Sequence, residues 1–360
     1  MAQTEQGGIL IYGSTGYTGR LVVADALQAG LPVEIAGRSA GKIAAQSGQV
    51  GVPGHAAALD DPDALDRALQ GKAVVIHCAG PFARTWRPMA EACLRNGVHY
   101  LDITGEIEVL EGLKSMGGVF ADAGLMALPG AGFDVVPTDF VAGTLAGALP
   151  DAVRLELAFH TRGTRASHGT ATSVLSRLGT GGAVRRDGRL RRVPTAWRTR
   201  RVDFGEGPRT CMTIPWGDLS TAHHTTSIPD ITVYIAAKPR MISLMKASNL
   251  LNPVLRTSAV RGMLQKRVDA MPAGPSERQR MEGRSLIWGR VENGSGDWAE
   301  ARLETMEGYR LTAATAVALA GDVLAGRVAA GYQTPFRAYP ELLAGMFPQV
   351  RVERSAKSGR

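Results

Sequence analysis

The chain has little cysteine, and this excludes several kinds of site. Cys78, Cys93 and Cys211 lie far apart and form no Cys-x-x-Cys pair, the spacing typical of zinc and redox motifs. We expect buried free thiols in a reducing cytoplasm, where disulfides are rare. The adjacent His223 and His224 would lie on opposite faces of a strand. The sequence therefore predicts no metal site.

Long hydrophobic runs are also missing. The first eight residues are polar and lack a basic region followed by an apolar stretch, so we expect no signal peptide. The most apolar stretch, residues 311–330, contains Asp322 and Arg327, which predicts a packed helix rather than an integral membrane span. With 44% hydrophobic and 21% charged residues, the composition is typical of a globular protein. We expect a cytoplasmic location.

Acidic and aromatic residues are in the minority. The chain has 33 Asp and Glu against 41 Lys and Arg, and aromatic residues make up 6%. Eight arginines lie between Arg185 and Arg201, where Trp197 is the only aromatic residue, so a stacking platform for bases is missing. We expect no nucleic-acid partner. The stretch either attracts an anionic partner, such as an acidic carrier protein or lipid, or forms a solvated β-hairpin whose arginines pair with carboxylates.

Glycine, by contrast, is abundant at 44 residues. Residues 9–12 predict a buried strand, residues 20–28 a helix and residues 33–36 a second strand, with the pattern Gly-x-x-Gly-x-x-Gly before the helix. In a βαβ unit, such a loop lets phosphate oxygens approach the backbone at the positive end of a helix. The predicted cofactor contacts here are Gly13, Ser14, Thr15, Gly16, Tyr17, Thr18 and Gly19. The alternative is a packing turn without a ligand.

The end of the second strand indicates which dinucleotide is bound. An acidic residue there would accept hydrogen bonds from the adenosine ribose and repel a 2′-phosphate. The chain instead has Arg38 and Ser39, with Lys42 nearby, and these cationic and hydroxyl groups suit a phosphate. We therefore predict NADP(H) as the cofactor rather than NAD(H). The alternative is that Arg38 is only a solvated charge.

A second turn is expected to contact the same cofactor. Residues 73–78, AVVIHC, form a continuous apolar run that predicts a central parallel strand. Ligands of doubly wound sheets bind beyond the carboxyl ends of the strands. This strand is followed by Ala79, Gly80, Pro81 and Phe82. We predict that these residues run along the diphosphate and the nicotinamide ribose.

The pattern changes in the second half, where alternating strands are predicted at 153–160, 231–238, 284–292 and 298–306. The predicted fold class is α/β, with a Rossmann-type doubly wound parallel sheet plus a second α/β domain with a mostly antiparallel sheet. We expect residues 1–135 to form the NADP-binding domain, completed by about 308–350. Residues 136–307 would form a substrate and dimerisation domain.

A further stretch, residues 241–270, is expected to be helical. Its apolar residues are Met241, Ile242, Leu244, Met245, Leu250, Leu251 and Met263. Such residues either line a pocket for a long apolar ligand or form plain core or a dimer interface.

The order of the motifs resembles a known family. GSTGYTGR, AGRS, HCAGPF, YLDITGE and PGAGFDVVPTD occur in that order, followed by GTATSVLSRLG, IPWGDLSTA, EGYRLTA and GYQTP. Together they look like the saccharopine dehydrogenase-like oxidoreductases, which include the trans-acting enoyl reductases of actinobacterial lipid biosynthesis. The resemblance implies an NADP-type Rossmann domain, a second α/β domain with the substrate pocket, and a C-terminal segment that rejoins the first domain. It also supports the predicted cofactor contacts.

Hydride transfer requires a polarised acceptor and a proton donor beside the nicotinamide. The candidate catalytic residues are Tyr17 in the glycine loop, Asp134 after the last strand of the first domain, and His168 at a helix start. The alternatives are that Tyr17 packs the loop, Asp134 caps the next helix and His168 is structural. Glu106 is expected to cap a helix or form a salt bridge rather than to catalyse.

The favoured function is NADPH-dependent reduction of a C=C bond in a lipid or polyketide-like substrate. The substrate would be a small molecule or an acyl group on an acidic carrier protein. The alternatives are a C=N (imine) reductase, an amino-acid-type dehydrogenase, or a non-catalytic NADPH-binding protein, because a fold alone does not imply catalysis. We expect a homodimer.

Overall fold

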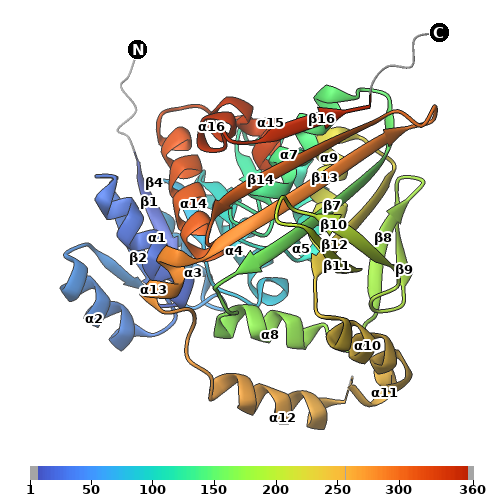
Figure 1. Cartoon of the computed structure of the whole chain (residues 1–360). Helices are drawn as coiled ribbons and strands as arrows, with labels where there is room; N and C mark the ends of the chain where they lie inside the picture. The colour runs from blue at the N-terminus through green and yellow to red at the C-terminus, as the bar shows by residue number, and fades with distance from the viewer. Residues whose placement is uncertain (1–6, 256, 356–360) are drawn as a thin grey trace. The chain divides into compact units, whose positions relative to one another are not determined.

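The computed structural model describes residues 7–255 and 257–355, and the chain divides into two compact units (Figure 1). The first unit comprises Met1–Val136 and Gly308–Tyr339, and the second comprises Pro137–Glu307 and Pro340–Arg360. We expected residues 340–350 in the first unit, but they belong to the second. The reason is packing, because Phe347 is buried with its ring centroid 5.2 Å from that of Phe140.

The first unit contains a seven-stranded sheet in the order β15-β6-β5-β4-β1-β2-β3, and its described pairings are parallel. The strands are β1 (Gly8–Tyr12), β2 (Val33–Gly37), β3 (Gly54–Ala56), β4 (Lys72–His77), β5 (His99–Asp102), β6 (Met126–Leu128) and β15 (Gly331–Tyr332). The order reverses between β1 and β4, which is the topological switch point of a doubly wound sheet. The predicted Rossmann-type parallel sheet is confirmed.

The helices of this unit follow local sequence signals. They are α1 (Tyr17–Gln28), α2 (Ala40–Val50), α3 (Pro62–Leu69), α4 (Phe82–Asn96), α5 (Ile107–Ser115), α6 (Gly117–Asp122), α14 (Gly308–Leu324) and α15 (Pro335–Ala338). For example, the Asp61 side chain accepts a hydrogen bond from the Ala64 amide, and Pro62 begins α3, because a cap satisfies an otherwise unpaired amide. Figure 1 shows α14 beside α1, although α1 ends at Gln28 and α14 begins only at Gly308.

The second unit contains a mixed sheet whose main path is β10-β11-β12-β7-β13-β14-β16, with β8 paired to β12 and β9 paired to β8. The strands are β7 (Ala152–Arg162), β8 (Gly182–Arg186), β9 (Arg189–Val193), β10 (Thr199–Asp203), β11 (Pro208–Thr213), β12 (Asp230–Ala236), β13 (Arg284–Asn293), β14 (Trp298–Met306) and β16 (Arg351–Arg354). Among the described pairings, that of β7 with β12 is parallel and the others are antiparallel. The predicted second sheet is thus present.

Helices surround this second sheet. They are α7 (Val136–Ala148, starting at the unit boundary), α8 (His168–Ser176), α9 (Asp218–Thr226), α10 (Pro239–Ala247), the 3₁₀ helix η1 (Ser248–Leu251), α11 (Asn252–Leu255), α12 (Ser258–Asp269), α13 (Glu277–Glu282) and α16 (Pro340–Met346). A Cβ at Gly289 on β13 would lie 2.5 Å from the Val141 side chain. Helix α7 therefore packs directly on the sheet at this glycine.

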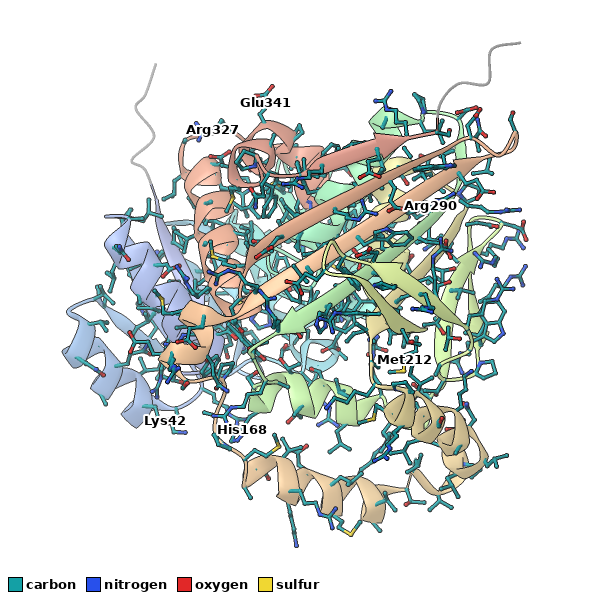
Figure 2. All side chains as sticks on the ribbon, viewed as in Figure 1. Lys42, His168, Met212, Arg290, Arg327 and Glu341 are labelled. Carbon is teal, nitrogen blue, oxygen red and sulfur yellow. The ribbon has the colours of Figure 1, made fainter. Side chains whose placement is uncertain are left out.

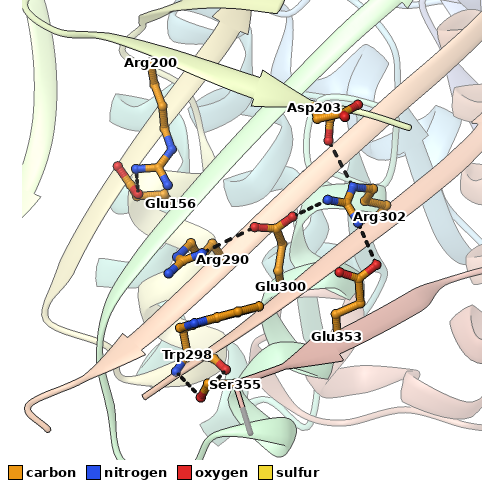
Figure 3. A network of polar contacts seen from close by, with 9 residues as sticks. All are labelled: Glu156, Arg200, Asp203, Arg290, Trp298, Glu300, Arg302, Glu353 and Ser355. Carbon is orange, nitrogen blue, oxygen red and sulfur yellow. Dashed lines mark hydrogen bonds and ion pairs between the residues drawn. The ribbon is translucent and has the colours of Figure 1, made fainter. Parts of the chain in front are cut away.

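Ion pairs cover part of the second sheet (Figure 3). Arg302 on β14 donates to Glu300 over 2.6 Å and to Glu353 on β16 over 2.9 Å, and it also donates to the Asp203 carbonyl over 3.0 Å. Arg200 pairs with Glu156. These contacts connect β14 with its neighbour β16, and they link β10 with β7 and β14, which are not its neighbours in the strand order.

The Arg185–Arg201 stretch includes the predicted hairpin, formed by β8 and β9. Arg185 is buried and donates to the carbonyls of Leu219 and Gly188 over 2.5 and 2.6 Å. Arg200 finds the carboxylate partner Glu156, whereas Arg191 and Arg192 on β9 are exposed. Docking of an acidic carrier protein here stays a prediction.

One local prediction was wrong. His223 and His224 lie in helix α9 rather than in a strand, because Leu219 and Ala222 are spaced as one buried helical face.

Two further expectations were free thiols and the absence of an integral membrane span. The three cysteines are free, with Cys93 and Cys211 buried and Cys78 partly buried. Among the described residues, no helix is both long and apolar enough to cross a membrane.

Candidate functional site

The glycine loop (residues 13–19) packs directly against the turn after β4. Gly13 has φ +81°, a region that glycine adopts without strain. A Cβ at Gly13 would lie 2.8 Å from the backbone nitrogen of Ala79, and one at Gly19 would lie 2.3 Å from the Gly13 carbonyl oxygen. Two predicted cofactor segments, the loop and residues 79–82, are therefore adjacent at the switch point of the sheet.

The start of α1 carries no acidic side chain of its own. Gly16 is its N-cap, its first turn has no Asp or Glu, and among the described residues no side chain caps it. Arg20 donates from Nε to the Thr15 carbonyl over 3.1 Å and holds the loop. The positive end of a helix dipole favours an anion, so this helix start suits a diphosphate.

Ser14 is hydrogen-bonded to Gln46, a partner that the sequence analysis did not predict. Its side chain is buried and donates to Gln46 Oε1 over 2.8 Å, while Gln46 Nε2 donates to the Ser14 carbonyl over 3.2 Å. These bonds join the glycine loop to α2. The Ser14 hydroxyl therefore positions the loop, and a bound cofactor would contact the backbone of the loop.

The three residues predicted to select NADP(H) gather where β2 ends and α2 begins. Arg38 is exposed, and Ser39 is the N-cap of α2, whose first turn has no acidic residue. Lys42 is also exposed, and Figure 2 labels it on α2. Burial raises the pKa of the nearby Tyr12 to about 12, with Arg38 lowering it and Asp60 raising it. This corner of the first unit thus combines a helix start with two exposed cations.

Beyond β4, a hydrogen-bonded chain fixes the backbone of residues 79–82. The Thr85 hydroxyl donates to the Ala79 carbonyl over 2.7 Å, and it lies 3.0 Å from His77 Nε2. Because Thr85 has one proton to donate, we assign the Nε2 proton to His77. Burial lowers the pKa of His77 to about 3, so this imidazole is neutral over the physiological range and serves as a structural donor.

Glu106 caps α4, which confirms the capping role expected for it. Its two carboxylate oxygens accept hydrogen bonds from the Phe82 and Ala83 amides over 3.1 and 3.0 Å. Phe82, predicted to lie in a turn, is the first residue of that helix. The positive end of α4 is therefore occupied by a carboxylate of the chain, in contrast to that of α1.

Two further carboxyl groups lie near Glu106. Asp102 is buried and accepts hydrogen bonds from the Tyr100 hydroxyl over 2.7 Å and from the Thr104 and Gly130 amides over 2.9 Å each. Burial raises the pKa of Asp102 to about 6. Burial, together with the Glu106 charge, raises the pKa of Asp134 to about 7. Asp134 is therefore partly protonated near neutral pH, which suits a proton donor.

Tyr17 and Phe133, the residue before Asp134, both contact the first turn of α14. The Tyr17 ring makes an edge-to-face contact with Tyr309, with centroids 5.1 Å apart. Within the glycine loop, Tyr17 is the residue at which α1 begins. A Cβ at Gly308 would lie 3.2 Å from the ring of Phe133, the residue before Asp134. The structure thus supports a packing role for Tyr17, and proton donation stays a prediction.

His168 belongs to the second unit. It is the first residue of α8, after the N-cap Ser167. Its ring Nε2 contacts the Met271 carbonyl, and its amide donates to the Ala273 carbonyl over 3.0 Å. These contacts hold α8 to residues 271–273, so they favour the structural role for His168. Its catalytic role stays a prediction.

Comparisons with known proteins identify the first domain. The model of the saccharopine dehydrogenase NADP binding domain matches residues 9–128. This confirms the predicted resemblance for that domain and its assignment as NADP-binding. The match includes the glycine loop and the Arg38 corner, and it ends at the last residue of β6.

Curated relatives match over a limited region. A saccharopine dehydrogenase-like oxidoreductase of Mus musculus is 29% identical over 153 residues, covering 36% of this chain and 35% of the relative. A Mycobacterium tuberculosis protein named as a trans-acting enoyl reductase is 32% identical over 139 residues, covering 36% of this chain and 33% of the relative. The chain thus spans about a third of the length of the curated relatives that it matches.

Solved structures extend the likeness in fold to nearly the whole chain. Saccharopine dehydrogenase (L-Glu forming) of Saccharomyces cerevisiae has a TM-score of 0.65 at 12% identity, covering 97% of this chain and 100% of that one. Homospermidine synthase of Legionella pneumophila, solved in complex with NAD, has a TM-score of 0.62 at 11% identity, covering 96% and 91%. At these identities the likeness concerns the fold alone.

Proposed function

Because residues 9–128 match the saccharopine dehydrogenase NADP-binding domain, we propose that this chain is an NADP(H)-dependent oxidoreductase. Its proposed reaction is reduction of a C=C bond in a lipid or polyketide-like acyl substrate. The observation that carries the cofactor part is the start of α2, where Arg38 and Lys42 replace the carboxylate that would repel a 2′-phosphate. The Mycobacterium tuberculosis relative is named as an enoyl reductase, and this name supports a C=C bond as the bond that is reduced.

The residues present fit this cofactor. The amides of the glycine loop would bind the diphosphate, and Arg38, Ser39 and Lys42 would bind the 2′-phosphate. Residues 79–82 would lie along the nicotinamide ribose, where Thr85 holds their backbone through the Ala79 carbonyl. When bound, the cofactor supplies the hydride. The chain contributes binding, orientation and a proton.

Asp134 and Tyr17 are the proposed proton donors of the first unit. Asp134 holds a proton near neutral pH because burial and the Glu106 charge disfavour its carboxylate. Reduction of an enoyl group leaves an enolate that must be protonated, and either group could supply that proton. The second unit would carry the substrate pocket, with His168 as its candidate polar residue.

Cofactor selection can be tested at Arg38. We expect tighter binding of NADPH than of NADH, and Arg38→Ala should weaken NADPH binding by about 10–100-fold because a charge-assisted hydrogen bond to phosphate is lost. NADH affinity should not change. Calorimetric titration of both nucleotides measures this, with Arg67→Ala on the exposed face of α3 as the matched control. Equal affinity of the unmutated protein for both nucleotides would contradict the assignment.

The bond that is reduced can be tested with two sets of substrates. We expect NADPH oxidation with enoyl thioesters and none with cyclic imines. The proton donor is tested with Asp134→Asn and Tyr17→Phe. The variant that removes the donor should lower kcat by about 10²–10⁴-fold without changing NADPH affinity. Turnover of imines alone would replace the C=C assignment by C=N reduction. Binding of NADPH without turnover of either set would favour the non-catalytic alternative.

A further inference from the structure

A cationic, apolar segment of the second unit is left largely uncovered. The segment runs from Lys238 to Met271 and includes α10, η1, α11 and α12. Its large apolar side chains are exposed by 42–87%: Met241, Leu244, Leu250, Leu251, Val254, Met263 and Met271. Among the apolar residues listed in the sequence analysis for this stretch, Ile242 alone is buried. The segment is therefore not plain core.

Helix α10 shows that the exposure is one-sided. Ile242 is buried and Met245 packs with it against Ala196 and Met212, so one face of α10 anchors the helix to the unit. Met241 and Leu244, each one position earlier, are 49% and 62% exposed. The helix thus has an inner apolar face, which is covered, and an outer apolar stripe that is not.

The next turn is also fixed in place with its apolar residues outward. Asn249 Oδ1 accepts from the Thr195 amide over 2.8 Å, and Asn249 Nδ2 donates to the Thr195 carbonyl over 3.0 Å. The neighbouring Leu250 and Leu251 are 87% and 55% exposed. These two hydrogen bonds therefore hold η1 in place, while Leu250 and Leu251 remain exposed.

Helix α12 is also held on its inner side, and its outer side carries both an apolar residue and positive charges. None of its twelve residues, all of which the structure describes, is buried. Arg261 donates to the Leu178 carbonyl over 3.1 Å and Gln265 donates to Thr172 on α8 over 3.1 Å. On the outer side, Met263, Lys266 and Arg267 are exposed, and their spacing of three and four residues places them on one face. Soluble helices normally owe their stability to burying such a face.

The segment is strongly cationic, with Asp269 as its one acidic residue. Between Asp230 and Asp269 the sequence has seven Lys and Arg and no Asp or Glu. Of these, Lys238, Arg240, Lys246, Lys266 and Arg267 are exposed. Leu and Met side chains interleaved with Lys and Arg are the pattern of helices that lie in the interface of an anionic membrane.

We propose that residues 238–271 dock the protein onto the surface of an anionic phospholipid bilayer. Leu250, Leu251 and the outer residues of α10 and α12 enter the boundary between headgroups and acyl chains, and the lysines and arginines contact lipid phosphates. A second copy of the chain fits less well, because a two-fold interface would set these cations against one another. The proposal does not rest on the proposed reductase activity.

The test is co-sedimentation of the full chain with vesicles, without any assay of activity. We expect binding to equimolar phosphatidylcholine and phosphatidylglycerol vesicles, little binding to phosphatidylcholine alone, and weaker binding at high salt. Lys266→Glu with Arg267→Glu should weaken binding by at least about tenfold. Leu250→Gln with Leu251→Gln should weaken it too while keeping every charge, so that electrostatics alone cannot explain the loss.

Two matched controls make the test specific. Arg351→Glu with Arg354→Glu changes the net charge equally at the exposed strand β16, outside both the segment and the Arg185–Arg201 stretch, and Val119→Gln removes an apolar side chain, 56% exposed, from the first unit. Both should bind vesicles like the unmutated protein. No binding to anionic vesicles, or equal losses in the controls, would overturn the proposal. So would dimerisation in light scattering that the leucine variant abolishes, because the segment would then cover a second copy.

Discussion

At the scale of single residues, the carboxyl ends of β5 and β6 bring three acidic groups together with different consequences. Glu106 is satisfied by the two amides at the start of α4, and Asp102 accepts bonds from Tyr100 and two amides. For Asp134, burial and the Glu106 charge both disfavour ionisation. Burial, the larger cause, and the Glu106 charge thus keep the Asp134 carboxyl group partly protonated near neutral pH.

This difference predicts a pH dependence of stability. The pKa of Asp134 is about 7 in the folded chain against a usual 3.8, so between these values the folded state binds a proton that the unfolded state has lost. Stability should therefore fall as pH rises from about 4 to 7. The upper limit of this loss is about 4 kcal/mol. Asp102 contributes in the same direction, because its pKa is also raised.

Asp134→Asn isolates the contribution of Asp134. Asparagine cannot ionise, so the variant should lose less stability than the unmutated protein between pH 4 and pH 7, with the two curves parallel above pH 8. Urea unfolding at a series of pH values measures the difference. Identical pH profiles for the two proteins would mean that Asp134 ionises normally.

At the scale of elements, the βαβ unit could be predicted because its signals are local. The apolar run of β1, the glycines and the apolar spacing of α1 all occur within residues 9–36. A capping role for Glu106 could be predicted, but not that it caps α4, because Glu106 is 24 residues from Phe82 in the sequence. The bond between Ser14 and Gln46 likewise joins residues 32 apart. Partners that meet only through the sheet leave no local pattern.

The wrong strand prediction for His223 and His224 has a different cause. His223 and His224 were interpreted from their adjacency alone, whereas the helix α9 depends on Leu219 and Ala222, which are spaced for one buried face. That spacing was present in the sequence and could have been used. The placement of residues 340–350 could not, because the burial of Phe347 beside Phe140 is a tertiary contact.

The glycine loop gives a prediction at this scale. Gly13→Ala should weaken NADPH binding and destabilise the first unit, because the new Cβ would meet the Ala79 nitrogen at 2.8 Å at a φ of +81°. Gly30→Ala is the matched control, since its φ is +68° but no described atom lies within 4 Å of the new Cβ. The control carries only the backbone cost of about 1–2 kcal/mol.

Thermal unfolding and NADPH titration of the two variants separate the effects. Both variants should unfold at a lower temperature than the unmutated protein, whereas only Gly13→Ala should lose affinity for the nucleotide. If both variants bound NADPH normally, the approach of the loop to the turn after β4 would not be needed for the site.

At the scale of the whole molecule, each unit is built from segments that are distant in the sequence. The first unit takes Gly308–Tyr339 from beyond the second, and the second takes Pro340–Arg360. Helix α14 contributes the larger part of the returning segment to the first unit, and it buries Leu311, Ala316 and Leu319. The sequence predicted that a C-terminal segment returns to the first unit. The residue after which the chain passes back to the second unit depends on packing.

This arrangement predicts which fragment folds. A single chain that joins Met1–Val136 to Gly308–Tyr339 through a Gly/Ser linker should fold and bind NADPH, because it contains every strand of the parallel sheet. Met1–Val136 alone lacks α14 and β15, and each buried leucine of α14 is worth about 1.5–3 kcal/mol. We therefore expect this shorter fragment to show no cooperative melting by circular dichroism and no calorimetric NADPH binding. A shorter fragment that melted cooperatively and bound NADPH as tightly as the joined chain would show that the returning segment is dispensable.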